Sequence, residues 1–345
     1  MSTSEADLTG FVPIPDDQLF KHAERVKDKV VVITGAASGI GRESAIRFAS
    51  FGAKIVIGDL DLSGAESTVS VIKASRGEAV ALKCNVTSFN DQVSLFDLAI
   101  ETYGSVDIVV PNAGIGEPES FFKVIFDKAG KPQKPNFPTI QVNLIGALYT
   151  VHLAQHYLLI NKEPDPHPLK SIVLMGSMSS WSAFPPAPIY SSGKHAILGL
   201  MRSLEPVLAL KGIRIACITP FFADTAIIPI LVKGFLAGCP LTPVPRIAGA
   251  IIYAASHPDP ATTGTGYLLP DDGPVFQVPK ERFQAGVYKL LDERANSLLK
   301  GVNGIAYIAR FSKDITKIMA KPLFTAVIAM TLWAYRNNLK KLIKV

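Results

Sequence analysis

The stretch VVVITGAASGIG at residues 30–41 decides the fold of this chain. Four apolar residues of β-forming type run into a turn with glycines at positions 35, 39 and 41, and residues 42–51 have a helical pattern. A buried strand that feeds a helix through a turn of low side-chain bulk lets a phosphate approach backbone N–H groups at the helix N-terminus. The stretch predicts either a nucleotide-binding turn or a tight turn that holds no ligand, since its glycine spacing differs from the common G-x-G-x-x-G.

Strand and helix patterns alternate along the rest of the chain. Apolar segments of β-forming residues lie at 30–34, 54–58, 79–85, 106–111, 171–175, 213–219 and 267–269. Helical patterns separate them at 42–51, 63–75, 89–103, 139–160, 190–211 and 247–255. This alternation predicts an α/β fold in which a parallel sheet is covered by helices on both faces.

Ligands of such a sheet bind beyond the carboxyl ends of its strands. The residues that follow the predicted strands are small or polar, namely Asp59, Asn85, Asn112, Ala113, Gly114, Ser177 and Pro220. Two irregular segments interrupt the alternation, one at 116–138 that is rich in Lys, Pro and Phe and one at 161–170. Both are predicted to be surface loops.

The positive charge of the chain belongs to its C-terminal segment. Of the formal net charge of +6, residues 310–345 contribute +7 through eight Lys or Arg against one Asp, which leaves −1 for the remainder. The segment does not interleave aromatic and cationic residues as nucleic-acid stacking platforms do, so no nucleic-acid partner is predicted.

The cysteine and histidine residues form no disulfide or metal pattern. Three widely spaced cysteines are typical of buried or inert thiols in a reducing compartment. His152 and His156 have metal-ligand spacing, but Leu153 replaces the glutamate of an HExxH helix, so no metal is predicted. The N-terminus lacks a signal-peptide pattern, and we expect a protein that is not secreted and lies in the cytoplasm or at the cytoplasmic face of an internal membrane.

Tyr190 and Lys194 form a YxxxK pair that lies on one face of a predicted helix. A cation near a phenol stabilises the phenolate and lowers its pKa from about 10 towards neutrality, which makes Tyr190 a candidate general base for an alcohol proton. Ser177 lies thirteen residues earlier, just past a buried strand, where its hydroxyl can hold a substrate oxygen. A solvated helix face is the alternative interpretation of the pair taken alone.

With these motifs in order, residues 28–275 resemble the short-chain dehydrogenase/reductase family. The matching elements are TGxxxGxG at 34–41, Asp59, NAG at 112–114, Asn143 in VNLIG, Ser177, Tyr190 and Lys194, and P-x4-T at Pro220 and Thr225. The resemblance implies a Rossmann-type doubly wound parallel sheet of about seven strands. It also implies a homo-oligomer.

The resemblance assigns roles to individual residues. Tyr190 is the acid/base, Lys194 binds the nicotinamide ribose, Ser177 orients the substrate and Asn143 supports the proton relay. The implied cofactor-binding set is Gly35, Ser38, Gly39, Ile40, Gly41, Asp59, Asn85, Val86, Asn112, Ala113, Gly114, Tyr190, Lys194, Pro220 and Thr225. In oxidation Tyr190 takes the alcohol proton while a hydride leaves for the nicotinamide.

Asp59 favours NAD over NADP as the cofactor. A carboxylate at this position accepts hydrogen bonds from the ribose hydroxyls and repels a 2′-phosphate. Ser38 and Leu60 stand where the family often carries phosphate-binding cations. Three residues depart from the family pattern, with Asn85 in place of Asp, Pro111 in place of Asn, and Phe221 in place of Gly.

The segment after the sixth predicted strand is unusually apolar, with Phe221, Phe222, Ile227, Ile228, Ile230, Leu231, Phe235 and Leu236. It predicts a cover for a bulky hydrophobic alcohol or ketone of terpenoid, steroid or lipid-like character, or else a surface that packs on a neighbouring subunit. A tailoring step in secondary-metabolite biosynthesis and general lipid metabolism stay open as alternatives. A non-catalytic nucleotide-binding scaffold or sensor is the alternative function.

The predicted organisation is an N-terminal arm (1–27), a Rossmann domain (28–277) and a helical C-terminal extension (278–345). Residues 323–335 are apolar and are followed by a basic cluster. Thirteen helical residues reach only about 20 Å, so peripheral membrane contact through 322–345 is favoured over a span, with packing on the protein as the alternative.

Overall fold

The computed structural model describes residues 10–118, 120–160, 168–182, 184–225, 234, 236–283, 330, 332 and 333. Contacts within the chain divide it into two units, Met1–Phe283 and Gln284–Val345. In the second unit the side chains of Met330, Leu332 and Trp333 are exposed, and the rest of the predicted tail lies outside the described residues. Within the described part of the chain, no helix combines the length and apolar character that crossing a bilayer requires.

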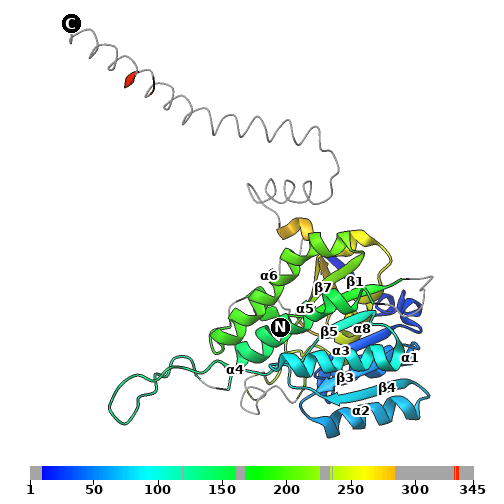
Figure 1. The fold of residues 1–345 in the computed structure, drawn as a ribbon, viewed down its shortest axis with the longest axis horizontal. Helices are drawn as coiled ribbons and strands as arrows, with labels where there is room; N and C mark the ends of the chain where they lie inside the picture. The colour runs from blue at the N-terminus through cyan, green and yellow to red at the C-terminus, as the bar shows by residue number, and fades with distance from the viewer. Residues whose placement is uncertain are drawn as a thin grey trace. The chain divides into compact units, whose positions relative to one another are not determined.

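A nine-stranded sheet forms the centre of the first unit (Figure 1), in the order β1-β9-β8-β7-β6-β5-β2-β3-β4. The sheet thus has two strands more than the predicted number of about seven. Its parallel part consists of seven strands: β2 (Val30–Thr34), β3 (Lys54–Asp59), β4 (Glu78–Lys83), β5 (Ile108–Pro111), β6 (Lys170–Met175), β7 (Ile213–Pro220) and β8 (Thr265–Leu269). Two antiparallel strands, β9 (Val275–Val278) and β1 (Val12–Ile14), extend one edge.

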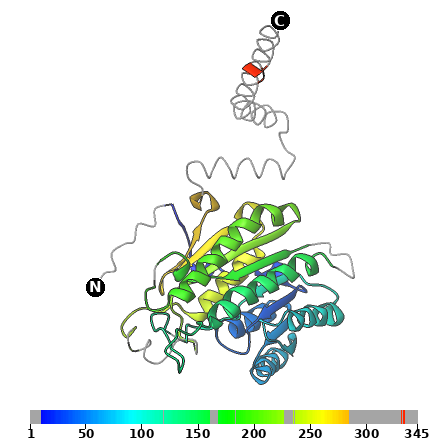
Figure 2. The same cartoon turned by 60° about the vertical axis from the view of Figure 1, so that its left-hand side comes forward.

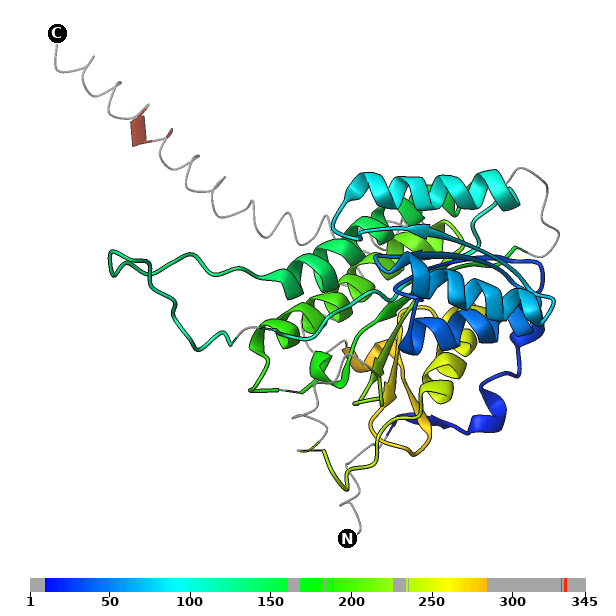
Figure 3. The ribbon, with the colours of Figure 1, turned by 90° about the horizontal axis from the view of Figure 1, so that it is seen from below.

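Helices cover both faces of the sheet, as the views in Figures 2 and 3 show. One face packs against α1 (Gly39–Ser50), α2 (Leu62–Ala74) and α8 (Val244–Ser256). The other face packs against α3 (Phe89–Tyr103), α5 (Ala147–Tyr157) and α6 (Pro188–Leu210). The doubly wound α/β fold is therefore confirmed.

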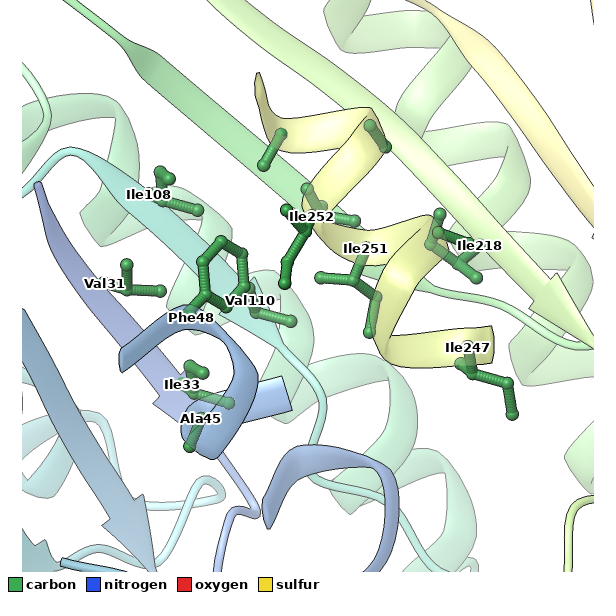
Figure 4. Packing of buried hydrophobic residues seen from close by; sticks show 14 of the residues in the cluster. Val31, Ile33, Ala45, Phe48, Ile108, Val110, Ile218, Ile247, Ile251 and Ile252 are labelled. Atoms are coloured by element: carbon green, nitrogen blue, oxygen red, sulfur yellow. The ribbon is translucent and has the colours of Figure 1, made fainter. Parts of the chain in front are cut away.

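Strand β2 is buried on both faces, which explains its unbroken apolar sequence. Val31 and Ile33 point into the core with α1 and α8, while Val30 and Val32 point into the core on the other side. Figure 4 shows the first of these cores, where Phe48 of α1 lies among side chains of β2, β5 and α8. Side chains that alternate between two cores fix the register of the strand, because a slip of one residue would exchange them all.

A buried ion pair ties three strands together at the amino end of the sheet. Asp107 Oδ1 lies 2.7 Å from Lys170 Nζ, with the side chains only 4% and 10% exposed. Asp107 Oδ2 accepts hydrogen bonds from Val30 N at 2.8 Å and Ser105 Oγ at 3.0 Å. The carboxylate thus joins the starts of β2, β5 and β6.

Residues 10–27, which belong to the predicted N-terminal arm (1–27), lie in the first unit and pack on it. They form β1 and two short 3-10 helices, η1 (Asp16–Gln18) and η2 (Ala23–Val26). Arg246 of α8 donates to both carboxylate oxygens of Asp16, at 2.7 and 2.8 Å. The pairing partner of β1 lies at the other end of the domain sequence, so local pattern gave no sign of this strand.

The helix predicted at 139–160 is divided into three parts. A short α4 (Pro138–Ile140) leads into a π-helical turn, η3 (Gln141–Gly146), and then into α5. The π-helical turn contains Asn143, a predicted site residue. Such turns inside α-helices are often found at functional sites.

Candidate active site

The carboxyl ends of β2 and β5 lie side by side at the centre of the sheet, with Thr34 opposite Pro111. Helix α1 follows β2 on one face, whereas α5, the first long helix after β5, covers the other face. The chain therefore leaves these neighbouring strands in opposite directions, which opens a crevice of the kind that binds ligands in doubly wound sheets. Pro111 occupies the last pairing position of β5, so this departure from the family pattern leaves the register intact.

The glycine turn between β2 and α1 has no room for side chains at two positions. Gly35 has a φ of +72°, and a Cβ there would lie 2.6 Å from the Cα of Ala113. A Cβ on Gly41 would overlap the carbonyl oxygen of Gly35 and lie 2.5 Å from Asn112 Nδ2. The backbone of the turn and the segment after β5 are thus in direct contact.

Asn112 and Thr34 hold that contact with hydrogen bonds. Asn112 Nδ2 donates to the carbonyl oxygens of Thr34 at 3.0 Å and Gly35 at 2.8 Å. Thr34 Oγ1 in turn accepts from the backbone N–H groups of Asn112 and Ala113, at 3.1 and 3.2 Å. The first two residues of the NAG motif therefore support the glycine turn through hydrogen bonds.

Helix α1 begins beside these residues, and the residue at its start is exposed. Ser38 is its N-cap residue and makes no capping hydrogen bond through its side chain, and Ile40 is half-buried. A Cβ on Gly39 would lie 3.4 Å from Thr225 Cγ2, so the segment after β7, which ends at Pro220, returns to the glycine turn. Exposed N–H groups at the start of a helix are suited to binding an anionic group.

Asp59 lies at the end of β3, against the same turn. Its Oδ2 accepts from Ala37 N at 2.8 Å, and its Oδ1 accepts from Asp61 N at 3.0 Å. The side chain of Leu60 next to it is 65% exposed. The carboxylate is therefore fixed at the glycine turn, and position 60 next to it carries an apolar side chain and not a phosphate-binding cation.

Asn85 and Val86 follow β4 and face different surroundings. Asn85 is exposed, and its Oδ1 accepts from the N–H of Thr87 at 3.0 Å and from its hydroxyl at 2.9 Å. Val86 is buried, and its carbonyl oxygen accepts from Gln92 Nε2 at 2.6 Å. The side-chain oxygen of Asn85 is thus engaged in its own turn.

Tyr190 and Lys194 lie on one face of α6, as their spacing predicts. Lys194 is buried, its Nζ donates to the carbonyl oxygen of Met175 at 2.8 Å, and it lies 5.5 Å from the centroid of the Tyr190 ring. Met175 ends β6, so the strand end positions the ammonium group. His195 makes a local hydrogen bond from Nδ1 to the backbone oxygen of Ser191 at 2.9 Å.

Ser177 is joined to Lys194 through Ser180, a residue that the sequence reasoning missed. Ser177 caps the short helix η4 (Met178–Ser180), and its N–H donates to Ser180 Oγ at 3.2 Å. Ser180 Oγ donates in turn to the backbone oxygen of Lys194 at 2.7 Å. The run of serines after β6 was the available signal, since it matches a capping box.

Asn143 holds the segment after the NAG motif. Its Oδ1 accepts from Ile115 N and its Nδ2 donates to Ile115 O, both at 2.8 Å. Thr139 Oγ1 donates to the carbonyl oxygen of Gly116 at 2.9 Å. These three bonds fix the path of residues 115 and 116.

Because the backbone follows that path, Glu117 lies at the N-terminus of α6. Glu117 Oε2 accepts from the backbone N–H of Tyr190 at 2.9 Å, while Ala187, the N-cap residue of α6, has no side chain that can cap. Glu117 Oε1 is buried and has no hydrogen-bond partner among the described residues. Sequence reasoning missed Glu117 because it lies in a predicted surface loop; a helix that begins Ala-Pro and lacks a local cap was the signal.

Much of the predicted apolar cover falls outside the described residues, including Ile227, Ile228, Ile230, Leu231 and Phe235. The rings of Phe221 and Phe222 lie 5.1 Å apart between centroids, and Phe222 lies 5.5 Å from Phe184. Leu236 is buried. The described part of this segment thus forms an aromatic cluster next to the start of α6.

The sequence of this chain matches a family of known proteins. The model of a family described as short chain dehydrogenase matches residues 29–231. The short-chain dehydrogenase/reductase ascJ of Acremonium egyptiacum is 30% identical over 285 residues, which cover 81% of this chain and 88% of that protein.

Two further similarities extend the comparison. The cis-4-hydroxycyclohexanecarboxylate dehydrogenase of Sinomonas cyclohexanicum is 30% identical, with 72% of this chain and 97% of that protein covered. A crystal structure from Sinorhizobium meliloti, described as a short-chain alcohol dehydrogenase, has a TM-score of 0.60 at 25% identity and covers 73% of this chain and 97% of its own.

Proposed function

Because this chain belongs to the short-chain dehydrogenase/reductase family, we propose that it is an NAD-dependent oxidoreductase that interconverts a secondary alcohol and a ketone on a bulky hydrophobic substrate. The observation that carries the proposal is the approach of Lys194 Nζ to the Tyr190 ring, with Ser177 tied to the same helix through Ser180. A phenol beside an ammonium group, together with a serine hydroxyl, is the set of groups that proton transfer to and from an alcohol needs.

The residues at the glycine turn fit a dinucleotide. The turn excludes side chains at Gly35 and Gly41, and α1 presents an exposed N-terminus, so a pyrophosphate can bind the backbone there. Asp59 would accept hydrogen bonds from ribose hydroxyls and would repel a 2′-phosphate, which favours NAD over NADP. Thr225, beside Gly39, would bind the carboxamide end.

The protein side of the reaction is proton transfer and positioning. Tyr190 accepts the proton of the substrate hydroxyl at its phenolic oxygen, and the ammonium of Lys194 stabilises the negative charge there. Ser177 holds the substrate oxygen, and Asn143 fixes the backbone at Ile115 that borders the site. NAD, when bound, supplies the acceptor for the hydride.

The aromatic cluster supports the proposed substrate class. Phe184, Phe221 and Phe222 pack edge to face after β7 and before α6. Cyclic or polycyclic apolar alcohols suit such a surface. A role in a tailoring step of secondary metabolism is proposed on the same ground.

A cofactor-reduction screen tests this function. Purified protein is mixed with hydrophobic secondary alcohols and with NAD or NADP, and reduced nicotinamide is followed by absorbance. We expect turnover with NAD, and loss of at least about 100-fold in kcat in Tyr190→Phe. Cofactor binding without turnover of any alcohol or ketone would support the nucleotide-binding scaffold instead.

Assembly and membrane contact through the second unit complete the proposal. Met330, Leu332 and Trp333 expose apolar surface, which supports peripheral contact of residues 322–345 with a membrane, and the family membership supports a homo-oligomer. Sedimentation velocity of the full chain and of a chain that ends at residue 321 tests the alternative, that residues 322–345 pack between subunits.

A further inference from the structure

Residues 120–138 form a hairpin, here called the 120–138 hairpin, that leaves the body of the first unit next to α4. Figures 1 and 3 show it extending away from the helices and strands. Its hydrogen bonds are its own: Gln133 N donates to Ile125 O at 2.8 Å, and Asp127 N donates to Lys131 O at 2.9 Å. Every residue from 121 to 137 is exposed.

The hairpin concentrates exposed apolar side chains. Sixteen large hydrophobic residues are exposed in the described part of the chain, and six of them lie here. They are Phe121 (53%), Phe122 (72%), Val124 (59%), Ile125 (52%), Phe126 (57%) and Phe137 (37%). Single exposed apolar residues need no explanation, but a contiguous group marks an interaction surface.

The same hairpin is basic. It carries Lys123, Lys128, Lys131 and Lys134 against one acidic residue, Asp127. The carboxylate of Asp127 accepts from its own turn, from Ala129 N at 2.8 Å and from Lys131 N at 2.9 Å. The outward charge is therefore positive, interleaved with phenylalanines.

We propose that the 120–138 hairpin docks on the surface of an anionic lipid bilayer. Phenylalanine and aliphatic side chains enter the interfacial layer, and the lysines contact anionic headgroups, which is the combination that interfacial protein segments use. A second copy of the chain fits less well, because a two-fold contact between hairpins would bring like-charged lysines together.

Docking there would bring the candidate active site to the membrane. The hairpin follows Gly116 and Glu117, which are bonded to Thr139 and to the N–H of Tyr190. The rim of the site and the hairpin are thus one continuous segment. This inference goes beyond the proposed function, which places membrane contact at residues 322–345 and not at the hairpin.

Co-sedimentation with vesicles tests the proposal on the full chain. Vesicles of phosphatidylcholine alone and of phosphatidylcholine with phosphatidylserine are compared at low and high salt. We expect binding to the anionic vesicles that weakens with salt. Phe121→Ser/Phe122→Ser should lower the partition coefficient about 10-fold or more, from the loss of buried apolar surface.

Lysine variants and a matched control separate the contributions. Lys128→Gln/Lys131→Gln keeps the apolar side chains and should lower binding to anionic vesicles about 10-fold while leaving neutral vesicles unchanged. Leu159→Ser/Leu210→Ser removes two exposed apolar side chains (54% and 50%) that precede β6 and β7, at the amino ends of the strands, and should bind as the parent does.

Three results would overturn the proposal. The first is that the parent protein fails to bind anionic vesicles. The second is that the hairpin variants bind as the parent does, which would assign binding to residues 322–345. The third is that the hairpin variants change the sedimentation coefficient while vesicle binding stays constant, which would make the hairpin a contact between copies. Circular dichroism melting checks that each variant is folded. If the phenylalanine variant is unfolded, vesicle binding of the lysine variant decides the proposal.

Discussion

Replacement of Glu117 tests whether a loop carboxylate positions the helix that carries Tyr190. Glu117 Oε2 accepts from the N–H of Tyr190 at 2.9 Å, in the first turn of α6. Ala187 offers no capping side chain, and Pro188 has no N–H to satisfy. Glu117→Ala therefore leaves the first turn of α6, which carries Tyr190, without this acceptor.

The expected size follows from helix capping. Loss of a side-chain cap costs about 1 kcal/mol, and loss of the negative charge at a helix N-terminus adds about 0.5 kcal/mol. If the first turn frays to that extent, the population with Tyr190 in place falls, and about 1.4 kcal/mol corresponds to about a 10-fold drop in kcat/KM. Glu117→Gln keeps an acceptor oxygen and should lose about 3-fold or less.

The assay is alcohol oxidation at saturating NAD, with thermal unfolding measured in parallel. Asp259→Ala is the control, because Asp259 caps the short helix η5 (Pro260–Thr262) at the amino end of β8, through a 2.8 Å bond from Ala261 N. It should lower the melting temperature without changing kcat. A Glu117→Ala enzyme with parental kcat/KM, or one whose loss Glu117→Gln does not relieve, would refute the positioning role.

Three further predictions concern cofactor choice, stability and pH. Asp59→Ser should shift the ratio of kcat/KM for NAD over NADP towards NADP by about 10-fold or more, and an unchanged ratio would contradict the proposed ribose contact. Asp107→Asn leaves the Lys170 ammonium buried beside a neutral group, so the free energy of unfolding in urea should fall by about 3 kcal/mol; a loss under about 1 kcal/mol would show that the pair is dispensable. Burial lowers the pKa of His22 and of His257, whose rings lie 5.1 Å apart. Because the unfolded chain then binds protons that the folded chain does not, stability should fall as pH drops below 6.5, the ordinary value, and His257→Phe should flatten this dependence in denaturation curves measured from pH 7 to about 5.

The parallel part of the fold could be predicted from the sequence because its signals are local. Strand β2 and helix α3 have the predicted bounds, since a strand buried on both faces and a helix with Ser88 as its cap leave marks in adjacent residues. Strand β1 could not be predicted, because three residues carry little pattern and the partner strand β9 is distant in sequence.

The candidate site was predictable in its residue types and not in its supports. The motif residues Gly41, Asn112 and Lys194 are recognisable because their motifs follow one another in order, and the roles assigned to them stay predictions. The bonds of Asn143 to the backbone of Ile115 and of Glu117 to the backbone of Tyr190 depend on a chain path that spacing alone does not give. Backbone partners are invisible in a sequence, since every residue type supplies the same N–H and C=O groups.

The two edges of the sheet limit how copies of this protein can aggregate. At one edge, β1 carries Pro13, which has no N–H to donate to an added strand. At the other edge, β4 begins with exposed Glu78 and ends with exposed Lys83, charges that oppose the docking of a further strand. Both edge strands thus oppose the pairing of a further strand, so a concentrated solution of the folded protein should resist fibril growth by strand addition at either edge.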